Sequence, residues 1–163
     1  MLGFHRPSIY CIFLINMNTP LQELEQLVST CNGAILYKPL VDETDYAEFS
    51  FPIKIHSNRI ILPANKDENP FAWADKCIEY FKKDTPYILI PGTRFDIEGT
   101  RHGKGGGWYD RFLSKVPKTW LKIGVTDTSK LSSQKLIKQP WDQNVGWIIA
   151  YGKDGWNIFK STL

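Results

Sequence analysis

The chain has 163 residues, a formal net charge of +3, and a composition that is 42% hydrophobic and 13% aromatic. This composition is that of a globular protein, and the length suits one domain over residues 1–163 with a core of its own. So small a charge gives no argument for nucleic acid as a partner, although it suits anionic small ligands. The longest apolar run, residues 9–15, is too short to span a membrane, so we expect no membrane partner.

The cysteines indicate the cellular compartment of the protein, and the first residues raise the question of where the domain begins. Cys11, Cys31 and Cys77 are odd in number and widely spaced, which favours reduced thiols and predicts a cytoplasmic protein. Residues 9–15 could form a buried strand. Because Met17 stands directly before a clear helix start, residues 1–16 could instead be an upstream extension of the reading frame.

The first clear element is a helix that begins after Thr19. Thr19 can cap it, Pro20 suits its first position, and Gln22 completes a capping box. An apolar stripe follows, and Asn32-Gly33 is expected to end the helix.

Short apolar runs then alternate with helical patterns along the chain. Strands are predicted for residues 34–37, 59–63, 87–90, 121–125, 146–151 and 156–159, and residues 51–55 alternate as in a half-exposed strand or ordered edge. Helices are predicted for residues 69–83 and 108–113, with a loop and short helix over 126–138. This alternation predicts an α/β fold with a mostly parallel sheet and helices on both faces.

Residues 86–113 have the strongest functional pattern. A strand closed by Pro91-Gly92 leads to a turn bracketed by Asp96 and Gly99, and the chain then reaches glycines at 103, 105, 106 and 107 and a helix start. Glycines let backbone N–H groups curl around an anion, and a helix start adds its own N–H groups. The pattern therefore predicts a phosphate site, with a plain flexible glycine turn as the alternative.

Three charged residues surround these glycines. Arg101 and Lys104 would add full positive charges beside the backbone dipoles. Asp110 alone would repel phosphate, but it could hold a Mg²⁺ ion that bridges phosphate oxygens. The loop matches neither GxxxxGK[ST] nor GxGxxG, so neither nucleotide fingerprint applies.

The same stretch resembles the signature of the 5-formyltetrahydrofolate cyclo-ligases, also called 5,10-methenyltetrahydrofolate synthetases. The family pattern is approximately PG-x-x-FD-x-x-G-x-R-L-G-x-G-x-G-Y-Y-D-R-[FY]-L. The chain follows it from Pro91-Gly92 to Leu113, with His102 in place of Leu and Trp108 in place of the first Tyr.

The resemblance implies a three-layer Rossmann-like sandwich and a monomeric, ATP- and Mg²⁺-dependent ligase. The implied substrate is 5-formyltetrahydrofolate, with or without a polyglutamate tail, which is cyclised to 5,10-methenyltetrahydrofolate with release of ADP and phosphate. Arg101 and Lys104 are the implied catalytic residues. The implied ATP-binding residues are Arg101, His102, Gly103, Lys104, Gly105, Gly106, Gly107, Trp108 and Tyr109.

Two other segments are similar to family motifs. The polar residues after the strand at 34–37 are similar to a motif whose Glu contacts folate, although Val41-Asp42 replaces its usual Pro-Gly. The similarity implies substrate binding by Glu43, with Lys38 and Tyr109 beside it, whereas without it Glu43 would be a solvated loop acid.

Residues 140–151 are similar to a motif whose first Asp serves the magnesium site, although Gly146 replaces its second Asp and Ala150-Tyr151 its Thr-Glu. The similarity implies that Asp142 joins Asp110 there, whereas without it Asp142 would be a plain turn residue.

Two family features have no match in the sequence. One is a basic helix, [KR]-x-x-x-R, that binds ATP phosphates near the start of the family's chains. The other is a longer folate loop before the strand at 87–90. These departures leave an alternative function open, a non-catalytic paralogue that binds folate or nucleotide and regulates or scaffolds.

Overall fold

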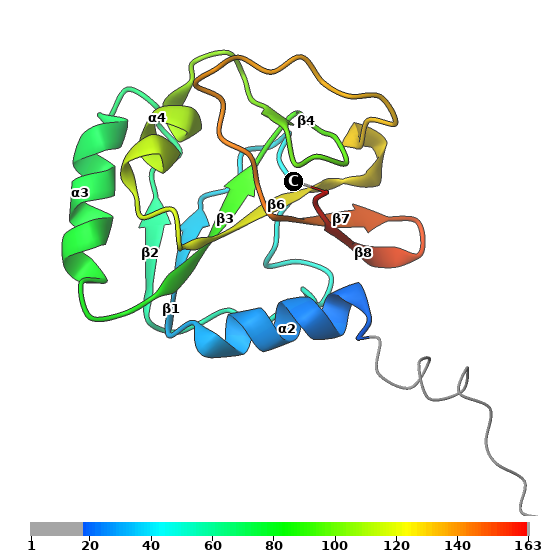
Figure 1. Cartoon of the computed structure of the whole chain (residues 1–163), viewed down its shortest axis with the longest axis horizontal. Coiled ribbons are helices and arrows are strands. Elements are labelled where there is room, and N and C mark those ends of the chain that lie inside the picture. Colours follow the sequence, from blue (N-terminus) through cyan, green and yellow to red (C-terminus); the bar gives the residue numbers. More distant parts are fainter. Residues whose placement is uncertain (1–17, 163) are drawn as a thin grey trace, which may run out of the picture.

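The computed structural model describes residues 18–162, so the strand considered at 9–15 and the extension considered at 1–16 lie outside its description. A six-stranded sheet in the order β2-β1-β3-β6-β7-β8 forms the centre of this part of the chain (Figure 1). Its strands are β1 (Gly33–Tyr37), β2 (Arg59–Leu62), β3 (Pro86–Pro91), β6 (Leu121–Asp127), β7 (Trp147–Gly152) and β8 (Gly155–Lys160). Neighbouring strands are parallel except β7 and β8, which form an antiparallel hairpin.

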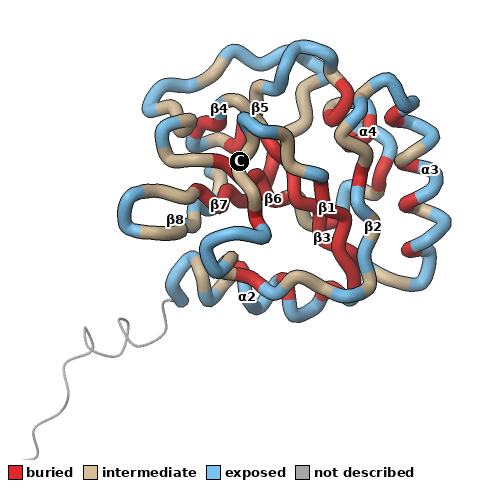
Figure 2. The backbone as a smooth tube through the Cα atoms, turned by 180° about the vertical axis from the view of Figure 1, so that it is seen from behind, coloured by how far each residue is buried: buried red, intermediate tan, exposed pale blue. Residues whose placement is uncertain are grey.

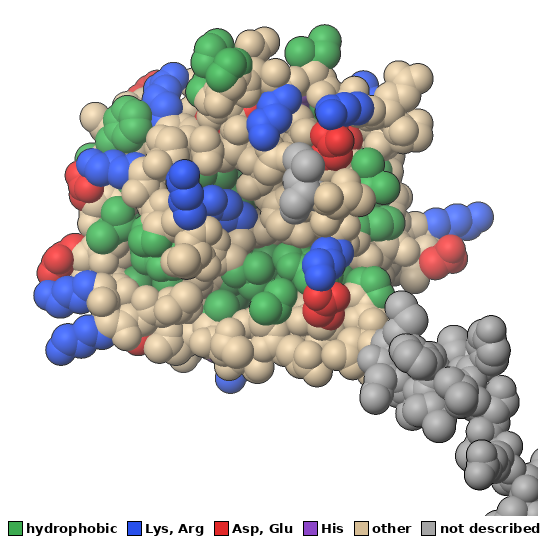
Figure 3. Space-filling model, viewed as in Figure 1, with side chains coloured by type: hydrophobic (Ala, Val, Ile, Leu, Met, Phe, Trp, Pro, Cys, Tyr) green, Lys and Arg blue, Asp and Glu red, His purple; other side chains and the backbone are tan. Residues whose placement is uncertain are grey.

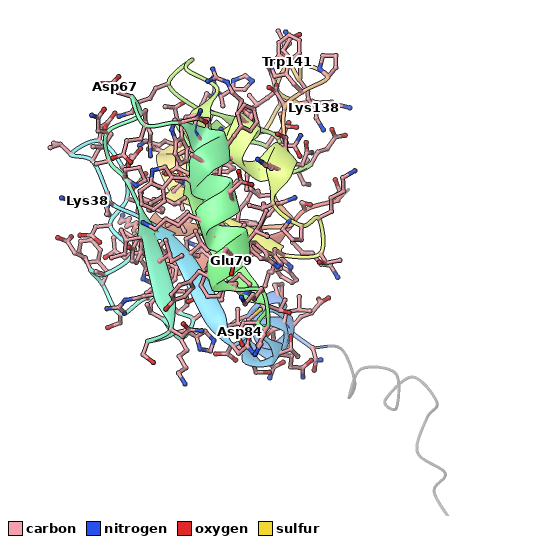
Figure 4. All side chains as sticks on the ribbon, turned by 90° about the vertical axis from the view of Figure 1, so that its left-hand side faces the viewer. Lys38, Asp67, Glu79, Asp84, Lys138 and Trp141 are labelled. Carbon is pink, nitrogen blue, oxygen red and sulfur yellow. The ribbon has the colours of Figure 1, made fainter. Side chains whose placement is uncertain are left out.

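Helices cover both faces of the sheet and make three layers. The helices α3 (Pro70–Tyr80) and α4 (Trp108–Lys115) pack against each other on one face, and Figure 4 shows α3 in front of the strands. The helix α2 (Pro20–Thr30) lies on the other face, where it contacts β8 (Figure 1). The predicted three-layer α/β architecture with a mostly parallel sheet is confirmed.

The strand order creates a crevice between β1 and β3. From β1 the chain crosses to β2 on one side, and it then returns through α3 to β3 on the other side of β1. Where the direction of the connections reverses in this way, the segments leaving the two strands diverge and leave room for a ligand at their carboxyl ends. Those ends are Tyr37 in β1 and Pro91 in β3.

Burial explains why these strands could be predicted from apolar runs. Every residue of β1 and β3 is buried, as Figure 2 shows in red for these central strands. Parallel strands covered on both faces are expected to be apolar throughout rather than alternating. The strand β2 lies at the edge of the sheet, and its Ile61 is 50% exposed.

The capping box predicted for α2 is present. The Thr19 hydroxyl accepts from the Gln22 backbone N–H at 3.2 Å, and the Gln22 side chain accepts from the Thr19 N–H at 2.9 Å. The end of this helix was predicted wrongly, because α2 ends at Thr30 and Gly33 is the first residue of β1. A Cβ atom at Gly33 would lie 2.4 Å from the Phe81 ring, so this glycine serves packing rather than helix termination.

Two further boundaries differ from expectation. Residues 51–55 form an irregular segment rather than a strand, and Phe51 in it packs edge-on against the rings of Tyr46 and Trp156. The apolar alternation there reflects side chains that pack beneath a loop. The helix α3 ends at Tyr80 rather than at residue 83, with Phe81 buried as its C-cap.

Two of the three cysteines lie in the described part of the chain. Cys31 and Cys77 are buried and form no disulfide, whereas Cys11 lies outside the described residues. Among residues 18–162, no helix is long and apolar enough to cross a membrane.

Gly124 of β6 provides a test of the packing beside the site. A Cβ atom there would lie 2.4 Å from the ring of Phe95, which is fully buried. We expect Gly124→Ala to lower the free energy of unfolding by about 1–3 kcal/mol, because the ring has no room to move. Urea denaturation measures this, with Gly146→Ala as the control, since the nearest atom to its new Cβ would be 3.9 Å away. Equal unfolding midpoints for the two variants would contradict the packing.

Candidate active site

A small hairpin follows β3 and is built around Asp96. Its strands are β4 (Arg94–Phe95) and β5 (Arg101–His102), which pair antiparallel. The Asp96 carboxylate accepts from the backbone N–H groups of Glu98 at 3.0 Å and Thr100 at 2.9 Å. These bonds close the turn that the sequence predicts between Asp96 and Gly99.

The hairpin also holds the segment after β6 in place. Asp96 Oδ2 accepts from the Leu136 N–H at 2.8 Å, and the Gly99 carbonyl accepts from the Val145 N–H at 2.9 Å. Gly99 has φ of +77°, and a Cβ atom there would lie 2.0 Å from the Val145 carbonyl oxygen. Only glycine fits so close an approach of two backbones with this φ, so Asp96 and Gly99 are structural residues of the site.

Arg101 lies at the centre of the site and is 5% exposed. Its Nη1 donates to the Pro91 carbonyl at 3.2 Å, and its Nη2 lies 3.3 Å from Asp110 Oδ2. Burial lowers the pKa of Arg101 and Asp110 opposes that shift, but a guanidinium keeps its charge in proteins. The buried Arg101 Nε has no hydrogen-bond partner among the described residues.

The glycine loop passes directly over this guanidinium. A Cβ atom at Gly103 would lie 2.8 Å from Arg101 Nη1, so a side chain would displace the arginine. Gly105 has φ of +90°, and Gly107, with φ of +64°, is the N-cap of α4 without a side-chain cap. A Cβ atom at Gly106 would meet nothing within 4 Å, so this loop residue borders open space. The glycine loop is therefore followed directly by the start of a helix, as predicted.

Two cavities lie on either side of Arg101 and the glycine loop. The first, of about 280 Å³, lies at the carboxyl ends of β1 and β3. It is lined by Leu40, Asp42, Glu43, Lys66, Pro91, Gly92, Thr93, Arg101, Gly103, Lys104, Gly106, Gly107, Trp108, Tyr109 and Lys130. The second, of about 460 Å³, is lined by Thr93, Arg101, His102, Gly103, Gly105, Gly107, Asp110, Ile137, Gln139, Trp141 and Asp142. Arg101 belongs to both walls, so one cation can reach ligands in either cavity.

The mouth of the first cavity is crossed by two contacts to Asp42. Lys104 Nζ lies 2.7 Å from Asp42 Oδ1, and Lys130 Nζ donates to the Asp42 carbonyl at 2.6 Å. The hydrogen bond from Lys104 lowers the pKa of Asp42 and raises that of Lys104 itself. The predicted catalytic Lys104 is thus present at the cavity, but its ammonium group pairs with an exposed carboxylate.

The predicted substrate residues separate into two groups. Glu43 and Tyr109 line the first cavity, where Glu43 Oε2 accepts from the Leu40 N–H at 3.0 Å. Lys38 is exposed, belongs to neither cavity lining, and points away from the body of the protein in Figure 4. Of these residues, the structure brings Glu43 and Tyr109 together.

The second cavity contains the carboxylates predicted for magnesium. Asp110 Oδ1 accepts from the Gln143 N–H at 3.0 Å, and Asp142 Oδ2 accepts from the Gln139 N–H at 2.8 Å. No cluster of three or more His, Cys, Asp or Glu residues suits a metal among the described residues. Magnesium commonly uses one or two carboxylates with phosphate oxygens and waters, so this pair fits the ion in the company of a phosphate ligand.

Trp141 and His102 complete the outer wall of the second cavity. Trp141 is 65% exposed, and Figure 4 shows it with Lys138 at the end of the molecule where the glycine loop lies. His102 Nε2 lies 2.7 Å from the Ile137 carbonyl oxygen. Along the upper edge of the face in Figure 3, basic side chains lie among hydrophobic and uncharged ones, and acidic side chains stand beside some of them.

Lys66 is a cavity residue that the sequence pattern does not single out. It follows β2 in an irregular segment, yet its Nζ lies 4.4 Å from the centroid of the Trp108 ring and 4.6 Å from that of Tyr109. Burial lowers the pKa of Lys66 to about 8. Long-range packing creates this environment, so local composition contains no signal for it.

The buried ion pair yields a test of stability. Arg101→Met leaves Asp110 without its cation, Asp110→Asn leaves the guanidinium without its anion, and the double variant removes both charges. We expect the single effects on the free energy of unfolding to be non-additive by about 0.5–3 kcal/mol, as for residues in direct contact. Urea denaturation of the four proteins measures this coupling, and strictly additive effects would show that the pair does not interact.

Comparison with known proteins agrees with this geometry. A sequence model of the 5-formyltetrahydrofolate cyclo-ligase family matches residues 60–150. The chain is 30% identical over 118 residues to the 5-formyltetrahydrofolate cyclo-ligase of Mycoplasma pneumoniae, covering 70% of each protein. It is 28% identical over 125 residues to that of Mycoplasma genitalium, covering 76% of this chain and 74% of the relative.

A solved structure supports the fold. The structure of a 5,10-methenyltetrahydrofolate synthetase from Mycoplasma pneumoniae superposes with a TM-score of 0.53 at 20% identity, covering 79% of this chain and 80% of that one. At this identity the likeness concerns the fold, whereas the sequence match extends across the glycine loop and both aspartates of the second cavity. The chain therefore belongs to the 5-formyltetrahydrofolate cyclo-ligase family.

Proposed function

We propose that the chain catalyses the ATP-dependent cyclisation of 5-formyltetrahydrofolate to 5,10-methenyltetrahydrofolate, with release of ADP and phosphate. The observation that carries this proposal is the pair of cavities that share the wall formed by Arg101 and the glycine loop. One cavity has aromatic and apolar walls suited to a flat heterocycle, and the other has backbone N–H groups and two carboxylates suited to nucleotide phosphates with Mg²⁺.

The proposed reaction requires ATP and the folate to bind next to each other, as two cavities with a common wall allow. The oxygen of the formyl group is a poor leaving group, so it first attacks the γ-phosphorus of ATP and the bond to ADP breaks. The folate N10 then attacks the formyl carbon, its proton passes to solvent, and phosphate leaves with the former formyl oxygen. The protein's part is to hold the reacting groups in line and to stabilise the charge on the moving phosphoryl group.

Two cations suit this task, Arg101 at the shared wall and Lys104 in the lining of the first cavity. The Arg101 guanidinium has a fixed fork of donors, and its Nε has no partner among the described residues. We assign it to the transferred phosphoryl group, together with N–H groups of the loop. Lys104 would exchange Asp42 for a phosphate oxygen, a small cost because exposed ion pairs contribute little to stability.

Asp110 and Asp142 would hold the magnesium ion of the nucleotide. When bound, Mg²⁺ neutralises negative charge on the phosphate oxygens. Asp110 is held by Arg101 and by the Gln143 N–H, and Asp142 by the Gln139 N–H, so both carboxylates keep their orientation without a metal. Glu43 and Tyr109 would bind the folate in the first cavity.

A direct assay tests the function. The purified chain is mixed with 5-formyltetrahydrofolate, ATP and Mg²⁺, and the absorbance of methenyltetrahydrofolate is followed, with omission of ATP as the control. We expect the absorbance to rise only in the complete mixture. Calorimetric binding of both ligands without a rise in absorbance would overturn the catalytic proposal in favour of a non-catalytic paralogue.

Gly106 lines the first cavity beside the shared wall, and it tests whether the loop approaches the transferred phosphate. Gly106→Val places a branched side chain in open space, so the fold should keep its free energy of unfolding while backbone approach to phosphate is blocked. We expect ATP affinity to fall by about tenfold or more, equivalent to about one charge-assisted contact. Calorimetry with ATP and Mg²⁺ measures the affinity. Unchanged affinity in the folded variant would place the phosphates elsewhere.

Asp142 tests the metal assignment without disturbing the Arg101 pair. In Asp142→Asn the amide oxygen can still accept from the Gln139 N–H, so the turn should persist while a charged ligand is lost. We expect the Mg²⁺ concentration for half-maximal turnover to rise about tenfold or more. Asp154→Asn, in the exposed turn between β7 and β8, is the control. If both variants respond to Mg²⁺ as the parent does, Asp142 is not a ligand.

A further inference from the structure

Lys66 has a fixed position in the first cavity. Its Nζ donates to the Pro63 carbonyl at 2.6 Å and to the Tyr109 hydroxyl at 3.2 Å. The ammonium group also lies over the faces of the Trp108 and Tyr109 rings. A lysine side chain has many rotamers, and these four contacts select one of them before any ligand arrives.

The remaining hydrogen-bonding capacity of Lys66 can serve a ligand. An ammonium group has three donors, and the contacts to Pro63 and Tyr109 use two of them. Lys66 lines the cavity, so the third donor is available to an acceptor bound there.

Glu43 supplies the complementary chemistry in the same cavity. A carboxylate is an acceptor only, and the Leu40 N–H occupies one position on Oε2. The cavity thus offers a donor on one element and acceptors on another, with Leu40, Pro91 and the Trp108 ring among its apolar walls. A ligand that fits has a flat ring with N–H donors beside a carbonyl acceptor along one edge.

The 2-amino-4-oxopyrimidine edge of a reduced folate has this arrangement. We propose that Lys66 is a folate-binding residue that donates to the ring carbonyl oxygen while Glu43 accepts from the neighbouring N–H groups. This inference rests on the proposed function and adds a specificity-determining residue to it. It also separates the cations by ligand, with Lys66 serving the folate and Arg101 the phosphates.

Charged groups around Lys66 set how its binding depends on pH. Burial lowers its pKa to about 8, Glu43 and Glu68 act to raise it, and Arg101 acts to lower it. Tyr109 stays neutral there, because burial raises the pKa of its hydroxyl. Since only the protonated lysine is a strong donor to a carbonyl, folate affinity should decline as the pH rises through about 8.

The test is calorimetric binding of 5-formyltetrahydrofolate and, separately, of ATP with Mg²⁺. We expect Lys66→Met to weaken folate binding about ten- to a hundredfold and to leave ATP affinity within about twofold. Lys66→Arg keeps the charge at all these pH values, so it should retain more affinity and lose the decline above pH 8. A merely structural lysine would not produce that change in the pH profile.

Lys76→Met is the matched control. Lys76 also places its Nζ over a tryptophan, 4.2 Å from the centroid of the Trp73 ring, but it lies on α3 outside both cavity linings. We expect its folate affinity and pH profile to equal those of the parent. The truncated ligand 5-formyl-6-methyltetrahydropterin keeps the 2-amino-4-oxo edge without the glutamate tail, and its binding should depend on Lys66 to the same degree.

The outcomes separate this inference from the proposed function. Equal folate affinity in the parent and Lys66→Met overturns the role of Lys66 alone, as does a loss confined to ATP. If Lys66→Met weakens binding of 5-formyltetrahydrofolate but not of the truncated pterin, Lys66 contacts the carboxylate tail, and the proposed contact with the ring carbonyl is overturned. A parent that binds folate through Lys66 but does not cyclise it supports the inference and overturns the reaction. A parent that binds no folate overturns both.

Discussion

Arg101 places a full positive charge where only 5% of the residue is exposed, and such burial is costly unless the charge is paired and hydrogen-bonded. The Asp110 carboxylate and the Pro91 carbonyl supply that compensation. Because a guanidinium presents its donors in a rigid fork, the same contacts fix the end of β3 against the first turn of α4. The two cavities exist on either side of this arrangement, so the architecture of the site depends on a compensated charge.

The hairpin between β3 and the glycine loop brings Arg101 into this position. Asp96 closes the turn with two hydrogen bonds and uses its other oxygen to hold Leu136, while Gly99 allows the Val145 backbone to approach. The segment that includes Asp142 is thereby tethered beside the loop. The functional motif thus contains two kinds of residue. Some stabilise the hairpin and its neighbours, and others line the cavities. The sequence alone does not distinguish the two kinds, but the structure does.

Local sequence patterns predict those structural features that depend on residues close together in the chain. The capping box at Thr19 and the turn at Asp96 depend on contacts within a few residues, and both are present. The strand β3 pairs with distant strands, but its continuous apolar run indicates burial whichever strands pair with it. The alternation at residues 51–55 misleads because Phe51 packs against Trp156, which is far along the chain. Lys66 gives no local signal for the same reason, since the rings that surround it belong to α4. That Asp110 and Asp142 line the same cavity could be inferred only through the family motif.

The exposed edge of the sheet has a consequence for behaviour in concentrated solution. In the described part of the chain β2 pairs only with β1, so its outer backbone groups could serve as a template for a strand of another molecule, with Ile61 half exposed beside them. The strand counters this hazard by its brevity: it spans four residues, begins at Arg59 and is followed by Pro63. Charge and proline at the ends of so short a strand disfavour intermolecular β-pairing. The chain can thus keep an open sheet edge at a low risk of aggregation.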